Sequence, residues 1–395
     1  MNNANIMTGR FDDFFELSLG RTPSRGIDSY WGGTHTWVSI SDMSSVKYIS
    51  NSKECITDIA ISDTNIPIVK KGTVIMSFKL SIGKVCITEK DLYTNEAIMA
   101  FVPKPQYNIL PVFLYYYLMS YKWNNSNDVV LGSTLNKKTI SQSIISIPSS
   151  LDEQKRIVEI LDKEFEKIDT LQANAEKGLQ QAKGLFQSAL KQELQPKEGW
   201  VIKKLGELCN ITSSKRIYKS EYVAEGIPFY RTKEVKEIAN GLPISAELFI
   251  SRERYDAIKQ KYGVPQINDM LVSAVGTIGE IMIIKDSNPF YFKDGNLVWL
   301  KNISDVIPTY LRYYLKSVID NIKSLTIGAA YDALTIEKFQ EMKICYPIIE
   351  QEQIVSRLDK LNEHCNTLQK NYEKTIALCD DMKQALLRKA FNGEL

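Results

Sequence analysis

The sequence has few of the residues and motifs that build catalytic centres. Its 395 residues include only two histidines, His35 and His364, and neither belongs to an H-E-x-x-H motif or a Cys/His cluster. No G-x-x-x-x-G-K-[ST] phosphate-binding loop is present, and no G-x-G-x-x-G follows a predicted strand. These absences indicate a chain that has no catalytic centre of its own.

One segment is similar to a catalytic motif but lacks part of it. Asn288-Pro289-Phe290-Tyr291 is close to the Asn-Pro-Pro-Tyr/Phe tetrapeptide of adenine methyltransferases, without the second proline. No glycine-rich cofactor motif accompanies it. We interpret the segment as an ordinary turn that leads into a strand.

Features of secreted and membrane proteins are also scarce. The six cysteines form no C-x-x-C pair, and we interpret them as small core residues in a reducing compartment. No apolar run is long enough to span a bilayer, and residues 1–15 lack the cationic and apolar pattern of a signal peptide. We therefore expect a cytoplasmic protein with no membrane partner.

The chain carries almost no net charge, since 49 Lys and Arg against 47 Asp and Glu give a net charge of +2. The small positive excess lies in two regions. Residues 1–150 carry 14 Lys and Arg against 12 Asp and Glu, and residues 196–347 carry 21 against 18. This excess is compatible with nucleic-acid contact by these regions. The length of the chain predicts two or more domains.

What the sequence does contain is one long helical run that occurs twice. A proline lies just before each run, Pro148 before the first and Pro347 before the second, and ends the preceding segment. Aligning Gln154 with Gln353 gives the same shift of 199 positions as aligning the two prolines. The two runs therefore start in equivalent ways.

Apolar residues recur at spacings of three and four along both runs, which we assign to residues 150–195 and 348–395. The pattern is typical of helices packed along their length, and a straight helix of about 40 residues is roughly 60 Å long. Because neither helix is expected to be stable alone, we predict an antiparallel coiled coil. The alternative is two ordinary long helices in a bundle. The stripes consist of Ile157, Leu161, Phe165, Ile168, Leu171, Ala175, Leu179, Ala182, Phe186 and Ala189 in the first run, and of Ile354, Leu358, Leu361, Cys365, Leu368, Tyr372, Ile376, Cys379, Met382 and Leu386 in the second.

The repeat extends to the regions that precede the helical runs. An apolar strand ending in Ser, a short loop and an Ile-Gly pair occur at residues 71–85 and again at 268–281. A helical stretch opened by proline follows in each copy, at residues 111–121 and 308–320. The order is therefore domain, long helix, domain, long helix.

We divide the chain accordingly. Residues 1–149 and 196–347 are predicted to form two mixed α/β domains, mostly strands with a few helices, because β-branched and aromatic runs alternate with Gly, Asn and Asp. Antiparallel pairing of the helices 150–195 and 348–395 gives the molecule an approximate two-fold axis, a symmetry that duplex DNA shares. We expect such a protein to read two different short sequences at a fixed separation.

The loops differ most between the two predicted domains. Lys79-Leu80-Ser81 stands against Ala274-Val275-Gly276, which carries no charge, and residues 132–138 stand against residues 328–332. Loops on a rigid scaffold commonly carry function. Similar scaffolds with divergent loops indicate two binding modules that have different specificities.

These features together resemble the specificity subunit of type I restriction–modification enzymes. The resemblance covers essentially the whole chain, and its pieces are residues 147–158, 346–355, 77–83 and 273–279. It implies two target recognition domains and a non-catalytic chain that supplies the sequence readout of double-stranded DNA. The site it reads is then asymmetric and bipartite, with one domain for each half-site.

The same resemblance implies the partners. Two methyltransferase (M) subunits carry S-adenosylmethionine and methylate adenine, and restriction (R) subunits cleave DNA with ATP and Mg²⁺, so this chain itself holds no cofactor or metal. Two other classes are weighed against it. A structural coiled-coil adaptor would not require paired recognition-like domains, and a self-contained restriction–modification enzyme would need cofactor and nuclease motifs that the sequence lacks.

Candidate DNA contacts follow from side-chain chemistry, since Arg and Lys bond guanine, Asn and Gln bond adenine, and aromatic groups contact thymine. Phosphate contacts position the protein without reading sequence. The alternative for each candidate is a solvated loop residue. In the first domain the candidates are Ser77, Lys79, Ser81, Lys84, Asn136, Lys137 and Lys138, with Arg21, Ser24 and Arg25 as phosphate binders. In the second they are Tyr230, Arg231, Thr232, Lys233, Ser273, Thr277, Tyr331 and Asp332, with Lys215 and Arg216 as phosphate binders.

Overall fold

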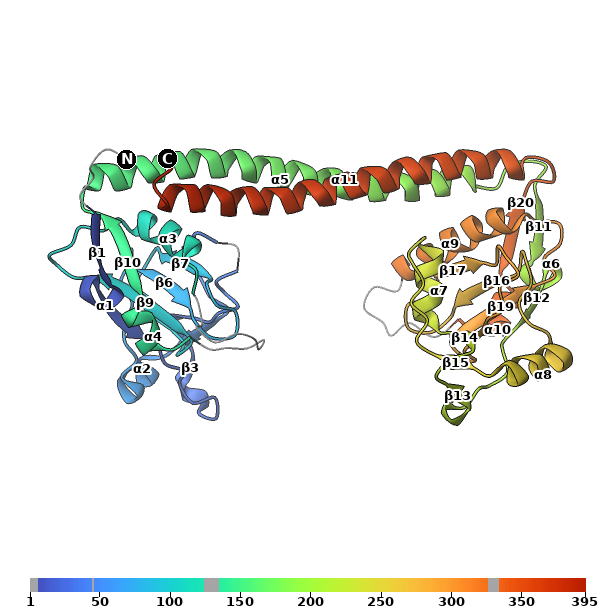
Figure 1. Ribbon diagram of the computed structural model, residues 1–395, viewed down its shortest axis with the longest axis horizontal. Coiled ribbons are helices and arrows are strands. Elements are labelled where there is room, and N and C mark those ends of the chain that lie inside the picture. Colours follow the sequence, from blue (N-terminus) through green and yellow to red (C-terminus); the bar gives the residue numbers. More distant parts are fainter. Residues whose placement is uncertain (1–5, 45, 124–134, 326–333) are drawn as a thin grey trace. The chain divides into compact units, whose positions relative to one another are not determined.

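The computed structural model describes residues 6–44, 46–123, 135–325 and 334–395 (Figure 1). The chain divides into two compact units. The first comprises residues 1–176 and 374–395, and the second comprises residues 177–373. Both long helices, α5 (Leu151–Glu193) and α11 (Gln351–Phe391), therefore contribute residues to each unit.

The start of α5 is fixed by a buried glutamine. The side-chain amide of Gln154 donates to the carbonyl oxygens of Pro148 and Asn108, each at 3.0 Å. Its amide oxygen accepts from the backbone N–H of Leu110 at 2.9 Å. Because a buried amide must satisfy its donors and acceptor, these bonds hold the start of the helix to the domain that precedes it.

The start of α11 repeats this arrangement with Gln351. Its side-chain amide donates to Pro347 at 3.0 Å and Asp305 at 2.9 Å, and its oxygen accepts from the N–H of Ile307 at 2.8 Å. The equivalent of Gln154 is therefore Gln351, and the alignment with Gln353 is wrong. The first linker holds two more residues between its proline and its glutamine, which a sequence alignment anchored on the prolines misplaces.

Within each unit the two helices run antiparallel, as predicted. In the first unit the guanidinium of Arg156 donates to the carbonyl oxygen of Leu395 at 3.0 Å, and Lys383 forms an ion pair with Asp169 at 2.6 Å. In the second unit Arg357 forms an ion pair with Glu193 at 2.8 Å. Positions late in α5 thus face positions early in α11.

The predicted apolar stripes are confirmed only in part. Ile157, Leu161, Ile354, Leu358 and both stripe cysteines, Cys365 and Cys379, are buried. Three predicted members are exposed instead, and in the last turns of α11 the fully buried residue is Leu387 and not Leu386. The exposed members lie away from the helix ends, which are the parts of α5 and α11 that join the domain cores. Leu171 is exposed because the alternation of three and four runs from Ile168 through the half-buried Gln172 to Ala175, which leaves Leu171 beside the seam. The exposed members are Leu171, Leu368 and Met382.

The first unit contains a five-stranded sheet in the order β2-β9-β6-β7-β4 and a three-stranded sheet in the order β5-β3-β8. A separate antiparallel pair joins β1 to β10, so the chain enters and leaves the domain side by side. The strands are β1 (Ile6–Arg10), β2 (Phe15–Leu19), β3 (Trp31–Val38), β4 (Tyr48–Ile49), β5 (Glu54–Ile56), β6 (Val74–Ser77), β7 (Val85–Thr88), β8 (Tyr93–Thr94), β9 (Ile98–Pro103) and β10 (Ile144–Pro148). The helices that accompany them are α1 (Phe11–Phe14), η1 (Asp28–Tyr30), α2 (Asp58–Thr64), α3 (Pro111–Ser120) and α4 (Lys137–Gln142).

The second unit contains two four-stranded sheets in the orders β12-β19-β16-β17 and β13-β15-β14-β18, with β11 paired to β20. The strands are β11 (Val201–Lys204), β12 (Asn210–Thr212), β13 (Tyr222–Val223), β14 (Ile227–Tyr230), β15 (Phe249–Ile250), β16 (Met270–Ser273), β17 (Ile281–Ile283), β18 (Tyr291–Phe292), β19 (Leu297–Lys301) and β20 (Lys343–Tyr346). The helices are α6 (Leu205–Leu208), η2 (Lys219–Glu221), α7 (Thr232–Ala239), α8 (Arg252–Tyr262), α9 (Pro308–Leu325) and α10 (Ile336–Gln340).

The two units therefore repeat one mixed α/β plan, as the sequence predicts. The order β2-β9-β6-β7 corresponds to β12-β19-β16-β17, and each proline-opened helix, α3 or α9, follows the last of these strands in the chain. The segment Asn288–Tyr291 leads into a strand as expected, because Tyr291 begins β18, but residues 288–290 are irregular and do not form a turn.

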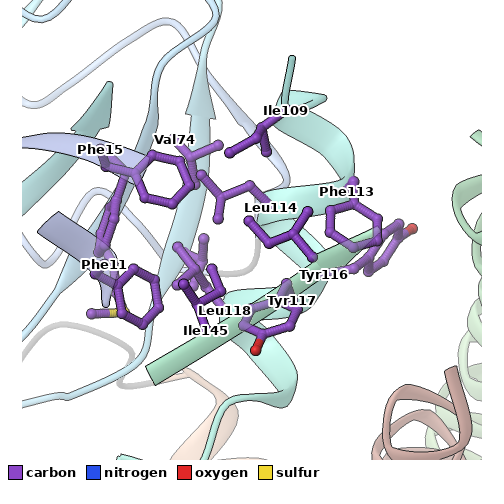
Figure 2. Packing of buried hydrophobic residues seen from close by; sticks show 14 of the residues in the cluster. Phe11, Phe15, Val74, Ile109, Phe113, Leu114, Tyr116, Tyr117, Leu118 and Ile145 are labelled. Carbon is purple, nitrogen blue, oxygen red and sulfur yellow. The ribbon is translucent and has the colours of Figure 1, made fainter. Parts of the chain in front are cut away.

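The core of each unit includes its share of the long helices. In the first unit α3 lies between the sheet and α5 (Figure 1), and Figure 2 shows Leu114 of α3 on the side of Phe15 and Val74 of the sheet. The ring of Phe113 lies on the other side of α3, with 5.5 Å between its centroid and that of the Phe391 ring in α11. In the second unit Ile354 of α11 joins the cluster formed by the sheet and α9. Burial raises the pKa of the Cys86 and Cys209 thiols to about 12, which suits inert core cysteines. None of the helices described is long and apolar enough to cross a membrane.

Candidate nucleic-acid interface

The loop between β6 and β7 is built around a buried serine. Ser77 is fully buried, its hydroxyl donates to the carbonyl oxygen of Ser81, and it accepts from the N–H of Lys84 at 3.1 Å. The N–H of Gly83 donates to the carbonyl oxygen of Ser77 at 2.9 Å. The loop is thus a closed turn held from within, and the half-buried Lys79 and the exposed Ser81 lie on it.

The loop between β16 and β17 has the same bonds. The hydroxyl of Ser273 donates to the carbonyl oxygen of Thr277 at 2.5 Å and accepts from the N–H of Glu280 at 2.8 Å, and Gly279 donates to Ser273 at 2.9 Å. Ser273 is fully buried, like Ser77. Both candidate serines therefore shape their loops, and burial leaves neither with surface for a base, whereas the exposed Thr277 keeps such surface.

In the first unit, Glu96 connects the β6–β7 loop to the segment that holds Arg21, Ser24 and Arg25. The hydroxyl of Thr22 donates to Glu96, and this bond, helped by the nearby charge of Lys79, holds the pKa of the Glu96 carboxyl below its usual range. Arg21 is exposed, and its guanidinium donates to the carbonyl oxygen of Thr64 at 2.5 Å. Glu96 thus connects two of the predicted groups of cations.

Arg25 lies on an aromatic surface. Its guanidinium carbon is 4.0 Å from the ring centroid of Trp31, and its two terminal nitrogens bond the carboxylate of Glu54. That bidentate bond raises the pKa of Arg25 and lowers the pKa of Glu54. The indole N–H of Trp31 donates to the carbonyl oxygen of Ser24 at 3.1 Å. Ser24 and Arg25 are both exposed, but the arginine already has an anionic partner.

The other first-domain candidates divide into structural and exposed positions. The ammonium of Lys84 donates to the hydroxyl of Ser44 at 2.8 Å and fixes a neighbouring loop. Asn136 caps α4, because its side-chain oxygen accepts from the N–H of Thr139 at 2.9 Å. Lys137 and Lys138 in the first turn of α4 are exposed and can reach a ligand outside the domain.

In the second unit Arg231 is held by two carboxylates. It forms ion pairs with Glu234 at 2.8 Å and with Glu247 at 2.9 Å, and these bonds raise its pKa. Burial alone would raise the pKa of Glu234, whose side chain is fully buried, but the hydrogen bonds from Arg231 outweigh it and lower that pKa. Lys233 shares Glu247. The arginine chosen for guanine contact is therefore part of an internal ion-pair network.

The neighbours of Arg231 are largely inside the domain. Tyr230 is 9% exposed and stacks on Phe290 with 4.6 Å between ring centroids. The hydroxyl of Thr232 is buried without a hydrogen-bond partner. This segment corresponds to the packed end of β14 and not to an exposed loop. Two further candidates, Tyr331 and Asp332, lie outside the described residues.

Lys215 and Arg216 join a cluster on α8 that the sequence analysis missed. The Lys215 ammonium lies 4.9 Å from the ring centroid of Tyr262, and the Lys261 ammonium lies 5.2 Å from the same centroid. A hydrogen bond from Lys261 lowers the pKa of the Tyr262 phenol, and the charges of Lys261, Lys215 and Arg254 add to this effect. Arg216 forms an ion pair with Asp294 at 2.8 Å. The result is an exposed patch in which cations surround an aromatic ring.

A signal for this patch is visible in the sequence. The α8 stretch, residues 252–262, holds four Lys and Arg against two Asp and Glu. In the first unit the helix that follows the corresponding short strand, α2, is acidic and contains no cation. Basic residues beside an aromatic side chain suit the phosphates of a nucleic acid. In the part of the chain that the structure describes, no cluster of His, Cys, Asp and Glu could hold a metal ion.

Comparison with known proteins decides the family. The sequence matches the description "Type I restriction modification DNA specificity domain" twice, over residues 3–181 and 197–378. The chain belongs to the type I restriction–modification DNA-specificity family. The two matches coincide with the two repeats of the fold.

Individual relatives agree with this family. The chain is 25% identical to the type I restriction enzyme MjaIX specificity subunit of Methanocaldococcus jannaschii, over 98% of this chain and 92% of the relative. It is 33% identical to a putative type I specificity subunit of Haemophilus influenzae over 42% of this chain and 40% of the relative. Both relatives are named as specificity subunits, which agrees with the DNA-specificity family to which the chain belongs.

Solved structures show the same fold. One solved chain, described by the words "Structural basis underlying complex assembly and conformational transition of the type I R-M system", covers 99% of this chain and 98% of its own length, with a TM-score of 0.76 at 19% identity. The HsdS subunit from Thermoanaerobacter tengcongensis covers 99% and 97%, with a TM-score of 0.56 at 20% identity. The predicted fold class is thereby confirmed.

Proposed function

We propose that this subunit reads an asymmetric, bipartite site in double-stranded DNA, with one recognition domain for each half-site. A DNA-specificity family supports the class of ligand. The internal repeat supports one half-site for each domain, because each domain has its own sheets, its own loop around a buried serine and its own attachment to a long helix. Unlike domains then give unlike half-sites.

The observation that carries the proposal is the pair of serine-centred loops. Ser77 and Ser273 make the same three hydrogen bonds, so the two loops are closed in the same way. The other side chains on them differ: Lys79 and Ser81 lie on the first, and Thr277 lies on the second. Constant support with variable outer residues is what two readers of different sequences require.

Other exposed cations then contact the phosphates. In the first domain these are Lys137, Lys138 and Arg21, and in the second they are Lys215 and Lys261 beside Tyr262. Such contacts supply affinity and set the register of the protein on DNA without selecting bases. The ion-paired Arg231 contributes to the stability of the second domain instead.

The reaction belongs to partner subunits in this proposal. Two methyltransferase subunits bring S-adenosylmethionine and methylate adenine in the two half-sites, and restriction subunits bring ATP and Mg²⁺ for cleavage. The complex works in the cytoplasm, where it reaches chromosomal DNA. The similar solved chain comes from work on complex assembly in a type I system, which supports partners of this kind for our chain.

The test is to sequence the methylated adenines of a host that lacks other methyltransferases. The host carries the methyltransferase subunit either with or without this chain. We expect a single motif made of two short parts separated by unspecified bases, and only when the chain is present. Methylation at the same sites without the chain, or at a single uninterrupted motif, would refute the proposal.

A further inference from the structure

One residue on the β6–β7 loop has a strained backbone conformation and is exposed to solvent. Leu80 lies at the tip of the turn with φ of +59°, a left-handed conformation that residues other than glycine rarely adopt. The residue is 95% exposed. A large apolar group in water and an unfavourable backbone conformation both disfavour leucine here, so folding of the domain does not explain its presence.

The second unit shows what this position requires structurally. The equivalent residue on the β16–β17 loop is Gly276, with φ of +76°, because Ser77 and Gly83 correspond to Ser273 and Gly279. The hydrogen bonds that close the two turns are the same. Glycine therefore satisfies the turn without strain, and the leucine of the first unit serves another purpose.

The surroundings of Leu80 favour a DNA base as its partner. Lys79 precedes it and the exposed Ser81 follows it, so the tip presents a cation, an apolar group and a hydroxyl in sequence. The turn beneath is tied down by the buried Ser77, which holds the tip in one shape. Bases in the major groove offer one strongly apolar feature, the 5-methyl group of thymine, and apolar side chains read it.

We propose that Leu80 is a specificity-determining residue that contacts the 5-methyl group of one thymine in the half-site read by the first domain. This inference rests on the proposed DNA-reading function. It assigns the apolar part of the readout to Leu80, and it gives the second domain, which has Gly276 at this place, no such contact.

The test uses the full chain in complex with its methyltransferase subunit. The duplexes carry the recognition motif that sequencing of methylated adenines identifies, in unmethylated form. Each thymine of the first half-site is replaced in turn by deoxyuridine, which removes only the methyl group. We expect one replacement to weaken binding by the wild-type complex about fourfold, which is about 0.8 kcal/mol per buried methyl at 25 °C. The same replacement should have no effect on the Leu80→Ala complex, and Leu80→Ala should leave the response to replacements in the other half-site unchanged.

Leu80→Gly separates this role from a structural one. Glycine relieves the left-handed strain, so the variant should unfold at the same or a higher temperature than wild type while losing affinity for the specific duplex. A purely structural leucine would lower stability and binding together when replaced. Leu80→Asn, which tolerates the left-handed conformation, should behave like Leu80→Gly in binding.

Two results keep this inference separate from the proposed function. If wild type discriminates its site from random duplex but Leu80→Ala stays as sensitive to deoxyuridine as wild type, the assignment of Leu80 is overturned and the proposed function stands. If wild type does not discriminate the two duplexes, the proposed function fails and the inference fails with it.

Discussion

The contact between Gly178 of α5 and Tyr372 of α11 gives a sharp test of the helix pairing in the second unit. A Cβ atom added at Gly178 would lie 2.4 Å from Cζ of the tyrosine ring and 2.6 Å from Cε1, distances that real Cβ atoms do not show. Gly178→Ala therefore forces the ring or the helix to move. Gly184, farther along α5, has nothing within 4 Å of such a Cβ and serves as a matched control.

The magnitude follows from two opposing effects. Alanine is favoured over glycine in a helix interior by about 1 kcal/mol, and overpacking a close contact destabilises by roughly 1–3 kcal/mol. We expect Gly178→Ala to lower the free energy of unfolding of the second unit by about 1 kcal/mol, and Gly184→Ala to raise it by about the same amount. In a Tyr372→Ala background the obstacle is gone, so Gly178→Ala should become stabilising.

Hydrogen exchange of peptides from residues 177–193, read by mass spectrometry, measures the local opening of this part of α5. The comparison is made within each background, because Tyr372→Ala removes packing of its own. The sign of the Gly178→Ala effect should reverse between the two backgrounds, with a coupling of roughly 2 kcal/mol. Equal protection of Gly178→Ala and Gly184→Ala in the wild-type background would show that the helices do not pack in this register.

Three further variants test the assignments of single residues. Lys137→Ala with Lys138→Ala should weaken binding to specific and random duplexes alike and reduce the log–log salt slope by about two, and an unchanged slope would reject phosphate contact. Arg231→Ala should destabilise the second unit by about 1.5–3 kcal/mol, because the buried carboxylate of Glu234 loses its charged hydrogen bonds, and a urea unfolding midpoint equal to that of wild type would contradict the ion-pair role. Gln351→Leu should lower the free energy of unfolding of the second unit by about 1–3 kcal/mol, because it leaves the N–H of Ile307 unpaired, and Gln154→Leu should lower that of the first unit by a similar amount. If hydrogen exchange shows a loss of protection for only one of the two variants, the two helix starts are not equivalent.

The repeat of the fold could be predicted from sequence because both copies carry the same marker residues in the same order along the chain. Prolines open α3 and α9 where expected, and both Ser-to-Ile-Gly segments are strand, turn and strand. The exact pairing of Gln154 could not be read, since it depends on a two-residue difference in linker length that only the hydrogen bonds reveal. The exposure of Leu171 was missed because the apolar leucine was preferred to the neighbouring Gln172, which takes the seam position between Ile168 and Ala175 and accepts a hydrogen bond from Lys383.

The candidate site was harder to predict because residue type does not report on partners. Arg231 has the right chemistry for guanine, but Glu247, distant in sequence, lies beside it in the fold. Ser77 and Ser273 lie in the correct loops, yet their hydroxyls bond the turn itself. Tyr262 gains its cationic neighbour Lys215 only when the segment after β12 and α8 come together. Sequence thus located the loops, and the structure sorted their residues.

The central claim, that each domain reads its own half-site, is tested most directly by exchanging residues 1–150 for the equivalent domain of a related subunit with a different target. The rest of the chain, including the helix start at Gln154 and the whole of residues 196–347, is kept. Sequencing of methylated adenines in a host that carries the hybrid and its methyltransferase gives the answer. Our account predicts a motif in which one half has changed and the other is identical to that of wild type; a motif altered in both halves would contradict it.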